Sequence, residues 1–378
     1  MGQPVRRVLV VGGGTAGSVA ALALRQRGVA VVLAEKQTGF STVGHGITLQ
    51  GNALRALQEV GVADQVIAAG YPWDRVRFRA ADGTLMQEMP MPPLGGESLP
   101  PGMGSMRFRL QQVLSEAVQA SGAEVRFGLG VQDLKDLDSE AGVAVTFTDG
   151  SEERFDLVVG ADGVHSTVRE LIGIEASPEP VGMAIFRMEG PRPAAMTCSE
   201  LYYGGPRYKA GYTPTGQDRM YAYVLDEDRR LEEYGDRPLH ELMAERSQGY
   251  GGLWDEIRAS MGPDTLIDYR SLDALRIDGP WYRGRVLLIG DAAHACPPML
   301  AQGAAMAAED GVVLGQLVGD GLPVEQVLST FMQRRGERAR MVVDNSVQLA
   351  KWEIAPGSPG ADPAGLMGRS MGALAASY

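Results

Sequence analysis

Short, mostly aliphatic runs recur along the chain and alternate with segments of helical periodicity. These runs occupy residues 8–11, 30–34, 155–159 and 286–289. Short continuous runs are typical of strands that are buried on both faces of a parallel sheet. The segments between them would cover the two faces of that sheet as helices. The pattern therefore predicts an α/β fold of the Rossmann type.

The pattern changes between residues 181 and 269, where apolar and polar positions alternate. The predicted antiparallel strands are 184–188, 199–203, 208–212 and 220–224, and two helices are expected near 238–247 and 252–260. Residues 75–89 alternate around Asp82-Gly83 and predict a hairpin, and 90–104 form a loop that could cover a site. Because tyrosines and Arg187 gather on this sheet, it would suit an aromatic or anionic small molecule.

Two helices towards the C-terminal part of the sequence follow from periodicity. Residues 324–351 predict a long helix, and a Pro/Gly-rich linker at 355–365 leads to a tail helix. The arginines of the long helix, at 334, 335, 338 and 340, are expected to form a solvated or interface face. Asn52 is expected to cap the helix that runs through Val60.

A glycine-rich turn follows the first aliphatic run. Gly12, Gly14 and Gly17 form a Gly-x-Gly-x-x-Gly pattern between a strand and a helix, and Glu35 ends the next strand. The glycines permit a tight turn, an approach to a pyrophosphate and close helix packing, and the carboxylate suits a ribose diol. Together they predict a dinucleotide site. The alternative is a glycine-rich turn with a solvated glutamate.

Three further segments carry polar residues next to predicted strands or helix starts. Arg107 and Gln111 lie one turn apart on a predicted helix, and Asp162 follows a buried strand with Ser166 and Arg169 after it. Gly290-Asp291 follows the last aliphatic run, and Gly303 begins a helix of small residues whose first amides lack intrahelical acceptors. That helix start is a potential anion or dipole site. Without further context, each segment could also be an ordinary solvated turn.

Composition narrows the choice of partner. The formal net charge is -12, and no basic tract interrupts the sequence, so nucleic acid and membrane surfaces are not expected partners. The two cysteines, Cys198 and Cys296, have no ligand-spaced histidine nearby, which argues against disulfides and a metal site. The apolar run near Met1 is too short for a signal or membrane segment, so we expect neither there. We therefore expect a cytoplasmic protein with a small-molecule partner, either a monomer or a homodimer.

His45 lies between Gly44 and Gly46, so the backbone there is expected to press against something flat or bulky. A histidine in this place could titrate near a cofactor or substrate. It could equally be a packed or exposed imidazole with no chemical role.

The order of the three strand-associated motifs resembles the class A flavoprotein monooxygenases of the p-hydroxybenzoate hydroxylase fold, and most closely the salicylate-hydroxylase-like members. The resemblance spans nearly the whole chain and includes the Arg-x-x-Leu-Gln start at Arg107. It implies FAD as cofactor, NADH or NADPH as transient co-substrate, and O2. The implied cofactor contacts are Gly12, Gly14, Thr15, Ala16, Gly17, Glu35, Lys36, Arg107, Gln111, Asp162, Arg169, Gly290, Asp291, Pro298, Gln302, Gly303 and Ala304.

The resemblance also implies hydroxylation of a small aromatic or heteroaromatic ring through a flavin C4a-hydroperoxide. His45 stands where the family commonly has a small residue, and it could be a base, a flavin contact or a point of covalent attachment. Tyr212 is a further candidate for the base, and the backbone near Pro298 would line the pocket. Ala301 and Ala305 depart from the glycine and asparagine that the family usually has there. An epoxidase or an antibiotic-modifying monooxygenase would share these motifs. A flavin halogenase or a reductase is a weaker alternative, because Trp73, Trp254, Trp281 and Trp352 never fall two residues apart.

The same resemblance predicts how the chain divides. A discontinuous Rossmann-type FAD-binding domain would take residues 1–73, 102–180 and 273–345. An inserted α+β domain with an antiparallel sheet, at 74–101 and 181–272, would bind the substrate. Residues 346–378 would form a C-terminal helical tail.

Overall fold

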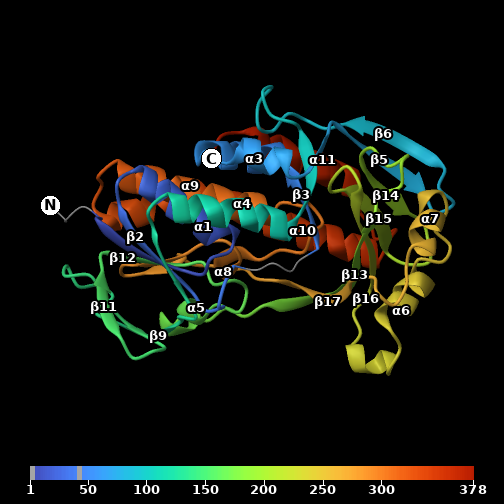
Figure 1. Ribbon diagram of the computed structural model, residues 1–378. Helices are drawn as coiled ribbons and strands as arrows, with labels where there is room; N and C mark the ends of the chain where they lie inside the picture. The colour runs from blue at the N-terminus through green and yellow to red at the C-terminus, as the bar shows by residue number, and fades with distance from the viewer. Residues whose placement is uncertain (1–4, 41–44) are drawn as a thin grey trace.

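A computed structural model describes residues 5–40 and 45–378 of the chain. Figure 1 shows a mixed α/β molecule with a helix-covered sheet at one end and a second large sheet at the other. Gly44, one of the two glycines beside His45, lies outside the described residues.

The first sheet has six strands in the order β18-β19-β12-β1-β2-β8. All neighbouring strands are parallel except β18, which pairs antiparallel with β19. The aliphatic runs form its centre, and Leu9 and Leu287 are completely buried. This confirms the predicted parallel sheet. Its strands are β1 (Arg7–Val11), β2 (Ala30–Glu35), β8 (Glu124–Phe127), β12 (Leu157–Gly160), β18 (Tyr282–Arg283) and β19 (Val286–Leu288).

Helices α1, α4 and α9 lie along one side of this sheet, and a small sheet of β9, β10 and β11 lies on the other side (Figure 1). Helices α1 and α9 can pack closely because Gly311 and Gly315 have no side chain. A Cβ at either position would collide with Ala20 or Ala23. These elements are α1 (Thr15–Gln26), α4 (Arg107–Ala120), α5 (Thr167–Leu171), α8 (Asp291–His294), α9 (Gly303–Gly319), β9 (Val131–Lys135), β10 (Val143–Phe147) and β11 (Glu152–Phe155).

The second large sheet has seven strands in the order β17-β13-β16-β15-β14-β5-β6. Its neighbours are antiparallel except β14 and β5, because β5 joins the sheet from a distant, earlier part of the chain. One face packs on α6 and α7 through an aromatic cluster that includes Tyr202, Tyr212 and Trp254. Its elements are β5 (Arg75–Ala80), β6 (Leu85–Pro90), β13 (Glu179–Pro191), β14 (Ser199–Tyr203), β15 (Lys209–Pro214), β16 (Arg219–Glu227), β17 (Ile267–Ala274), η1 (Leu231–Tyr234), α6 (Leu239–Arg246) and α7 (Leu253–Ala259).

A small antiparallel sheet in the order β3-β7-β4 links the two halves. Its strand β3 leads into α2, and its strand β7 leads into α4, so this sheet places both His45 and Arg107. Gly104 of β7 lies directly against Thr213 and Pro214 of β15. The elements here are β3 (Gly46–Gln50), β4 (Tyr71–Trp73), β7 (Gly102–Met106), α2 (Gly51–Glu59) and α3 (Ala63–Ala68).

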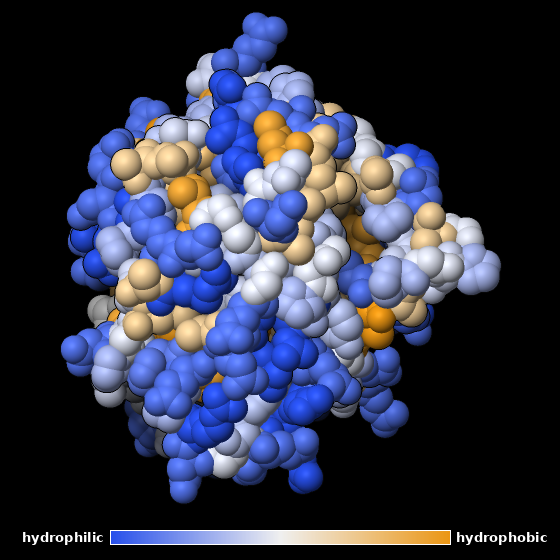
Figure 2. Space-filling model, turned by 90° about the vertical axis from the view of Figure 1, so that its right-hand side faces the viewer, coloured by the Kyte–Doolittle hydropathy of each residue, from blue (hydrophilic) through white to orange (hydrophobic). Residues whose placement is uncertain are grey.

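Helix α10 (Val324–Ile354) contacts α9 at one part of its length and β13 at another, and α11 (Pro363–Ala375) packs beside it. The bounds of α10 confirm the long helix that was predicted at 324–351. In the described ranges, no helix is both long enough and apolar enough to cross a membrane. Figure 2 shows the end of the molecule formed by the seven-stranded sheet, where hydrophilic residues dominate and apolar ones are scattered between them.

Candidate functional site

The glycine turn after β1 leaves no room for side chains at two of its positions. Gly12 has a φ of +102°, and a Cβ there would lie 2.5 Å from the Ala161 carbonyl oxygen. A Cβ at Gly17 would lie 1.9 Å from the Gly12 carbonyl oxygen. At Gly14, by contrast, a Cβ would meet no described atom within 4 Å, so the turn is open on that side. Helix α1 begins there without a side-chain cap, and its first amides are free to bind an anion.

Glu35 and Gln111 hold this turn from two sides. The Gly13 amide donates to Glu35 Oε2 at 2.8 Å, and Gln111 Nε2 donates to the Gly13 carbonyl oxygen at 2.7 Å. Helix α4, which was predicted to carry Gln111 and Arg107 on one face, therefore reaches the turn. Lys36 is exposed just beyond Glu35, and Thr15 and Ala16 form the first turn of α1.

Asp162 and Arg169 form a structural unit next to this turn. Asp162 accepts hydrogen bonds from Ser166 Oγ at 2.5 Å and from the Val168 amide at 3.0 Å. Ser166 caps α5 by accepting from the Arg169 amide. The buried Arg169 guanidinium donates to three carbonyl oxygens, one of them on Ala292 at 3.0 Å. Burial lowers the pKa of Arg169, and Asp162 opposes this shift. The Arg169 side chain therefore binds the backbone of α8 directly, at Ala292.

The Gly290-Asp291 turn meets the start of α1, although the two lie far apart in the sequence. Gly290 has a φ of +60°, and a Cβ there would lie 2.8 Å from Ala16 Cβ. Asp291 is exposed at the first position of α8. Arg107 is close enough for Asp291 to raise its pKa, whereas burial and the nearby Arg187 lower it, with a net lowering. The Arg107 side chain is exposed at the first position of α4.

A tight loop from Pro298 to Gly303 forms the other side of this turn. Pro298 is exposed, Ala301 adopts a φ of +52°, and Gln302 is buried. Helix α9 begins at Gly303 without a side-chain cap, so the amides of Gly303 and Ala304 have no intrahelical acceptor. Because Gly311 and Gly315 of α9 lie against Ala20 and Ala23 of α1, the two helices run in the same direction, and their free amides open towards one region.

The seven-stranded sheet brings a charged cluster to the same region. Arg187 and Arg270 both pair with the Asp268 carboxylate, and His45 Nε2 lies 3.7 Å from Asp268 Oδ2. Burial, followed by the positive charge of Arg187, lowers the pKa of His45 below its ordinary 6.5, so the imidazole is neutral at pH 7. Asp268 and Arg270 were not predicted. Their spacing of two on a strand, which places both on one face, is the signal that could have found them.

Two tyrosines of this sheet lie on opposite faces. Tyr221 packs against Gly46, where a Cβ would lie 2.2 Å from Tyr221 Cβ, and burial raises its pKa to about 12. Tyr212, the predicted candidate, is paired in register with Ala222 and points into the aromatic cluster under α6 and α7. Its hydroxyl donates to Glu200 Oε2 at 2.7 Å. The structure therefore separates Tyr212 from the other site residues, because adjacent residues on a strand face opposite ways.

The residues fit FAD on the chemistry of their donors and on shape. Two uncapped helix starts offer amides to an anion, a glycine turn without room for Cβ atoms forms a cradle, and Glu35 offers a carboxylate next to it. Asp291 and Arg107 lie between that cradle and the charged cluster of the second sheet. These groups suit an elongated, anionic dinucleotide.

Comparisons with known proteins agree with this geometry. A family model described as an FAD binding domain matches residues 6–346. The 2-heptyl-3-hydroxy-4(1H)-quinolone synthase of Pseudomonas aeruginosa is 33% identical over 354 residues, covering 92% of this chain and 90% of that protein. The 6-hydroxynicotinate 3-monooxygenase of Pseudomonas fluorescens is 30% identical over 356 residues, covering 89% of each. The solved structure of tetrameric 2-methyl-3-hydroxypyridine-5-carboxylic acid oxygenase matches with a TM-score of 0.80 and 26% identity, covering 95% of each chain.

Proposed function

Since the chain belongs to the FAD-binding domain family and is an FAD-dependent monooxygenase, we propose that it hydroxylates a small aromatic or N-heteroaromatic ring that carries a hydroxyl and an anionic group. The observation that carries this proposal is the arginine-rich cluster beside the FAD site, formed by Arg107, Arg187 and Arg270.

The charges of this cluster favour an anion. Arg187 and Arg270 share one carboxylate, that of Asp268, and both lower the pKa of Arg107 by repulsion. A bound carboxylate or phenolate would relieve this repulsion and could form charge-assisted hydrogen bonds with a guanidinium. Two of the three named relatives support the choice, because hydroxynicotinate and the hydroxypyridine acid both combine a ring hydroxyl with a carboxylate.

His45 is the proposed base in this cluster. A neutral imidazole can accept the proton of a ring hydroxyl, and the resulting oxygen anion makes the ring more electron-rich. Asp268, 3.7 Å from His45 Nε2, would stabilise the imidazolium that forms. We assign the flat wall of the substrate site to Tyr221 in place of Tyr212, and a further wall to the backbone of Pro298.

We also propose how the chain holds its cofactor. Bound FAD supplies the redox chemistry that inserts one atom of O2 into the ring and reduces the other to water at the expense of NAD(P)H. The α1 end holds the ADP half, Asp291 binds the ribityl hydroxyls, and Asp162 and Arg169 support the backbone between them. The proposed contacts are Gly12, Gly14, Thr15, Ala16, Gly17, Glu35, Lys36, Arg107, Gln111, Gly290, Asp291, Pro298, Gln302, Gly303 and Ala304.

The remaining assignments are proposals of the same kind. We propose that residues 1–73, 102–180 and 273–345 bind FAD, that 74–101 and 181–272 bind substrate, and that NADH or NADPH docks transiently. A cytoplasmic location is supported by the free cysteines Cys198 and Cys296.

NAD(P)H oxidation by the purified protein tests the substrate class. The panel contains hydroxynicotinates, hydroxypyridine carboxylates, salicylates, neutral phenols and an alkylated quinolone, with product mass recorded. We expect one anionic ring to stimulate oxidation and to gain one oxygen atom. Stimulation only by the neutral phenols or by the quinolone would contradict the anionic substrate class.

A further inference from the structure

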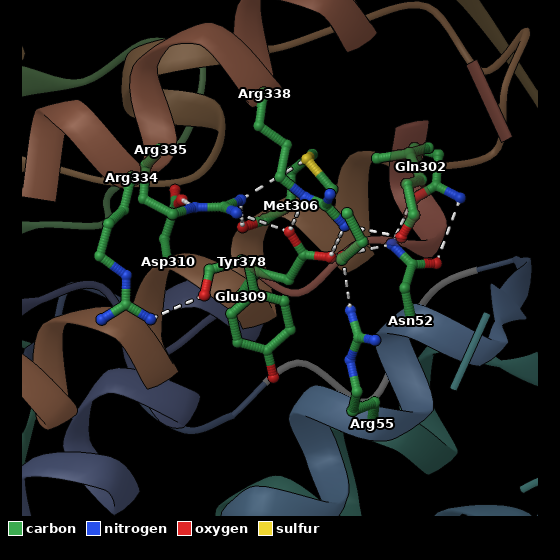
Figure 3. A network of polar contacts seen from close by, with 12 residues as sticks. Asn52, Arg55, Gln302, Met306, Glu309, Asp310, Arg334, Arg335, Arg338 and Tyr378 are labelled. Carbon is green, nitrogen blue, oxygen red and sulfur yellow. Dashed lines mark hydrogen bonds and ion pairs between the residues drawn. The ribbon is translucent and has the colours of Figure 1, made fainter. Parts of the chain in front are cut away.

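Two adjacent carboxylates, Glu309 and Asp310, are fully buried in the middle of α9 (Figure 3). Arg335 of α10 donates to both, from Nε to Asp310 Oδ1 at 2.7 Å and from Nη1 to Glu309 Oε2 at 2.6 Å. Arg338 adds two bonds to Glu309, at 2.7 and 2.9 Å. Burial opposes the ionisation of both acids. Arg335 and Arg338 outweigh it for Glu309, and His294 together with Arg335 outweighs it for Asp310, so the pKa of each acid is lowered. Both acids are therefore charged acceptors at neutral pH.

The Asp310 side of this pair reaches the Gly290-Asp291 turn. Asp310 Oδ2 accepts from the Gly290 amide at 2.9 Å and is 2.6 Å from His294 Nε2. These two contacts bind both ends of α8, the short helix that begins with Asp291. Asp310 thus fixes the backbone from which Asp291 projects.

The Glu309 side reaches the Pro298–Gly303 loop through a chain of three buried amides. Asn52 Nδ2 donates to Glu309 Oε1 at 3.0 Å and to Gln302 Oε1 at 2.8 Å. Gln302 Nε2 then donates to Gln50 Oε1 at 2.9 Å. Gln50 Nε2 donates in turn to the Leu300 carbonyl oxygen at 2.8 Å. We call this series, from Glu309 through Asn52, Gln302 and Gln50 to Leu300, the amide relay.

The charge of Glu309 sets the direction of the whole relay. A carboxylate can only accept, so Asn52 must turn its NH2 group towards it. That choice leaves Gln302 Oε1 as the acceptor for Asn52, and therefore turns the Gln302 NH2 group towards Gln50. Gln50 must then present its NH2 group to Leu300, whose carbonyl can only accept. The relay ends next to Ala301, which has a φ of +52°, in the left-handed region that favours glycine.

We propose that Glu309 and Asp310 are positioning residues that hold both flavin-binding loops at once, Asp310 through the Gly290 amide and Glu309 through the amide relay. Neither acid touches the cofactor. Both act through groups that do, and Gln302 uses its side chain in the relay, which leaves the first amides of α9 uncapped for the flavin. The inference rests on the proposed position of the flavin between these two loops.

Variants that cut the relay without creating a buried charge test the proposal. Asn52→Leu removes the links to Glu309 and Gln302, and Gln50→Leu removes the links to Gln302 and Leu300. We expect each to raise the dissociation constant of FAD by about tenfold, equivalent to ~1.4 kcal/mol, and to shift the visible absorption bands of bound flavin. Both quantities are measured by adding FAD to the apoprotein, with the melting temperature of the apoprotein recorded alongside.

Asn345→Leu is the matched control, because Asn345 is a half-buried amide that donates to Ser370 Oγ at 2.9 Å outside the relay. It should lower the melting temperature without changing FAD affinity or spectrum. The proposal is overturned if Asn52→Leu and Gln50→Leu behave like this control. If Asp291→Ala also binds FAD normally, the position of the flavin itself is wrong. If only Asp291→Ala weakens FAD binding, the flavin position stands and the positioning role is wrong.

Discussion

At the scale of single residues, Asp291 offers the most direct test of the cofactor position. It is an exposed carboxylate at the meeting point of α1, α8 and α9, and nothing in its described surroundings requires it for folding. A hydrogen bond to a charged group contributes roughly 1.5–3 kcal/mol. Asp291→Ala should therefore weaken FAD binding by roughly that amount, as measured by titration calorimetry, with little change in apoprotein stability. Asp278→Ala, at another exposed aspartate, is the control and should bind FAD normally.

His45 makes a prediction about pH. The pKa of His45 lies below the ordinary 6.5, and only the neutral imidazole can accept a proton. The value of kcat/KM should therefore fall as the pH drops through this lowered pKa. His45→Gln should lose this acidic limb and lower kcat/KM by about 10²–10⁴-fold, the usual contribution of a general base. A pH–rate profile of both proteins decides it, with His240→Gln on α6 as the control. An unchanged acidic limb in His45→Gln would assign the base to another residue.

At the scale of elements, helices and strands were predictable where burial follows a simple period. The long helix predicted at 324–351 is α10, Val324–Ile354. Its arginines were predicted to form a solvated or interface face. Arg340 is exposed, whereas Arg335 is buried and Arg338 is half-buried, both of them paired with acids of α9. A charged residue is buried when it meets an opposite charge, and its partners Glu309 and Asp310 lie on another helix. Periodicity within one helix contains no information about such a partner.

The same limit explains Asn52, which was predicted to cap α2. Helix α2 begins at Gly51, so Asn52 lies inside the helix and not at its cap position. The Asn52 side chain bonds with Gln302 and Glu309 instead. Capping residues are recognised by local sequence, whereas these partners are remote. Strand prediction has the matching weakness: it found the strands that carry Tyr212 and Tyr221 but not which face each tyrosine occupies.

The Pro298–Gly303 loop carries a prediction about backbone strain. Ala301 has a φ of +52°, in the left-handed region that favours glycine. Ala301→Gly removes a cost of about 1–2 kcal/mol, and the greater freedom of glycine in the unfolded chain returns about 0.4–1 kcal/mol of it. Urea denaturation should therefore show a slightly more stable protein. A clear loss of stability would show that the Ala301 methyl group makes contacts that outweigh the strain.

At the scale of the whole molecule, the meeting of distant motifs was predictable because parallel strands end at one edge of a sheet. Val11 pairs with Gly160, and Gly160 pairs with Leu288, so the turns at residues 12, 161 and 290 adjoin. How the second sheet approaches that edge was not predictable. Asp268 and Arg270 reach His45 only through the packing of β3 and β7 between the two sheets, which no local pattern encodes.

Glu309 and Asp310 of α9 bond with side chains of α2, α8 and α10, and this buried pair should make the stability of the whole protein depend on pH. Glu309 and Asp310 have pKa values below the ordinary 4.5 and 3.8, so at acidic pH the unfolded chain binds more protons than the folded one. The free energy of unfolding must then rise with pH in this range. The stabilisation is fully present above the ordinary values and is lost as the pH falls towards the lowered ones. Asp310→Asn removes one of the two titrating groups, so its free energy of unfolding should depend less on pH between about 3 and 5. Urea denaturation at a series of pH values measures this slope. Asp278→Asn, at the exposed aspartate used above, should keep the slope of the unmodified protein, and equal slopes in all three proteins would show that the buried pair does not link folding to protonation.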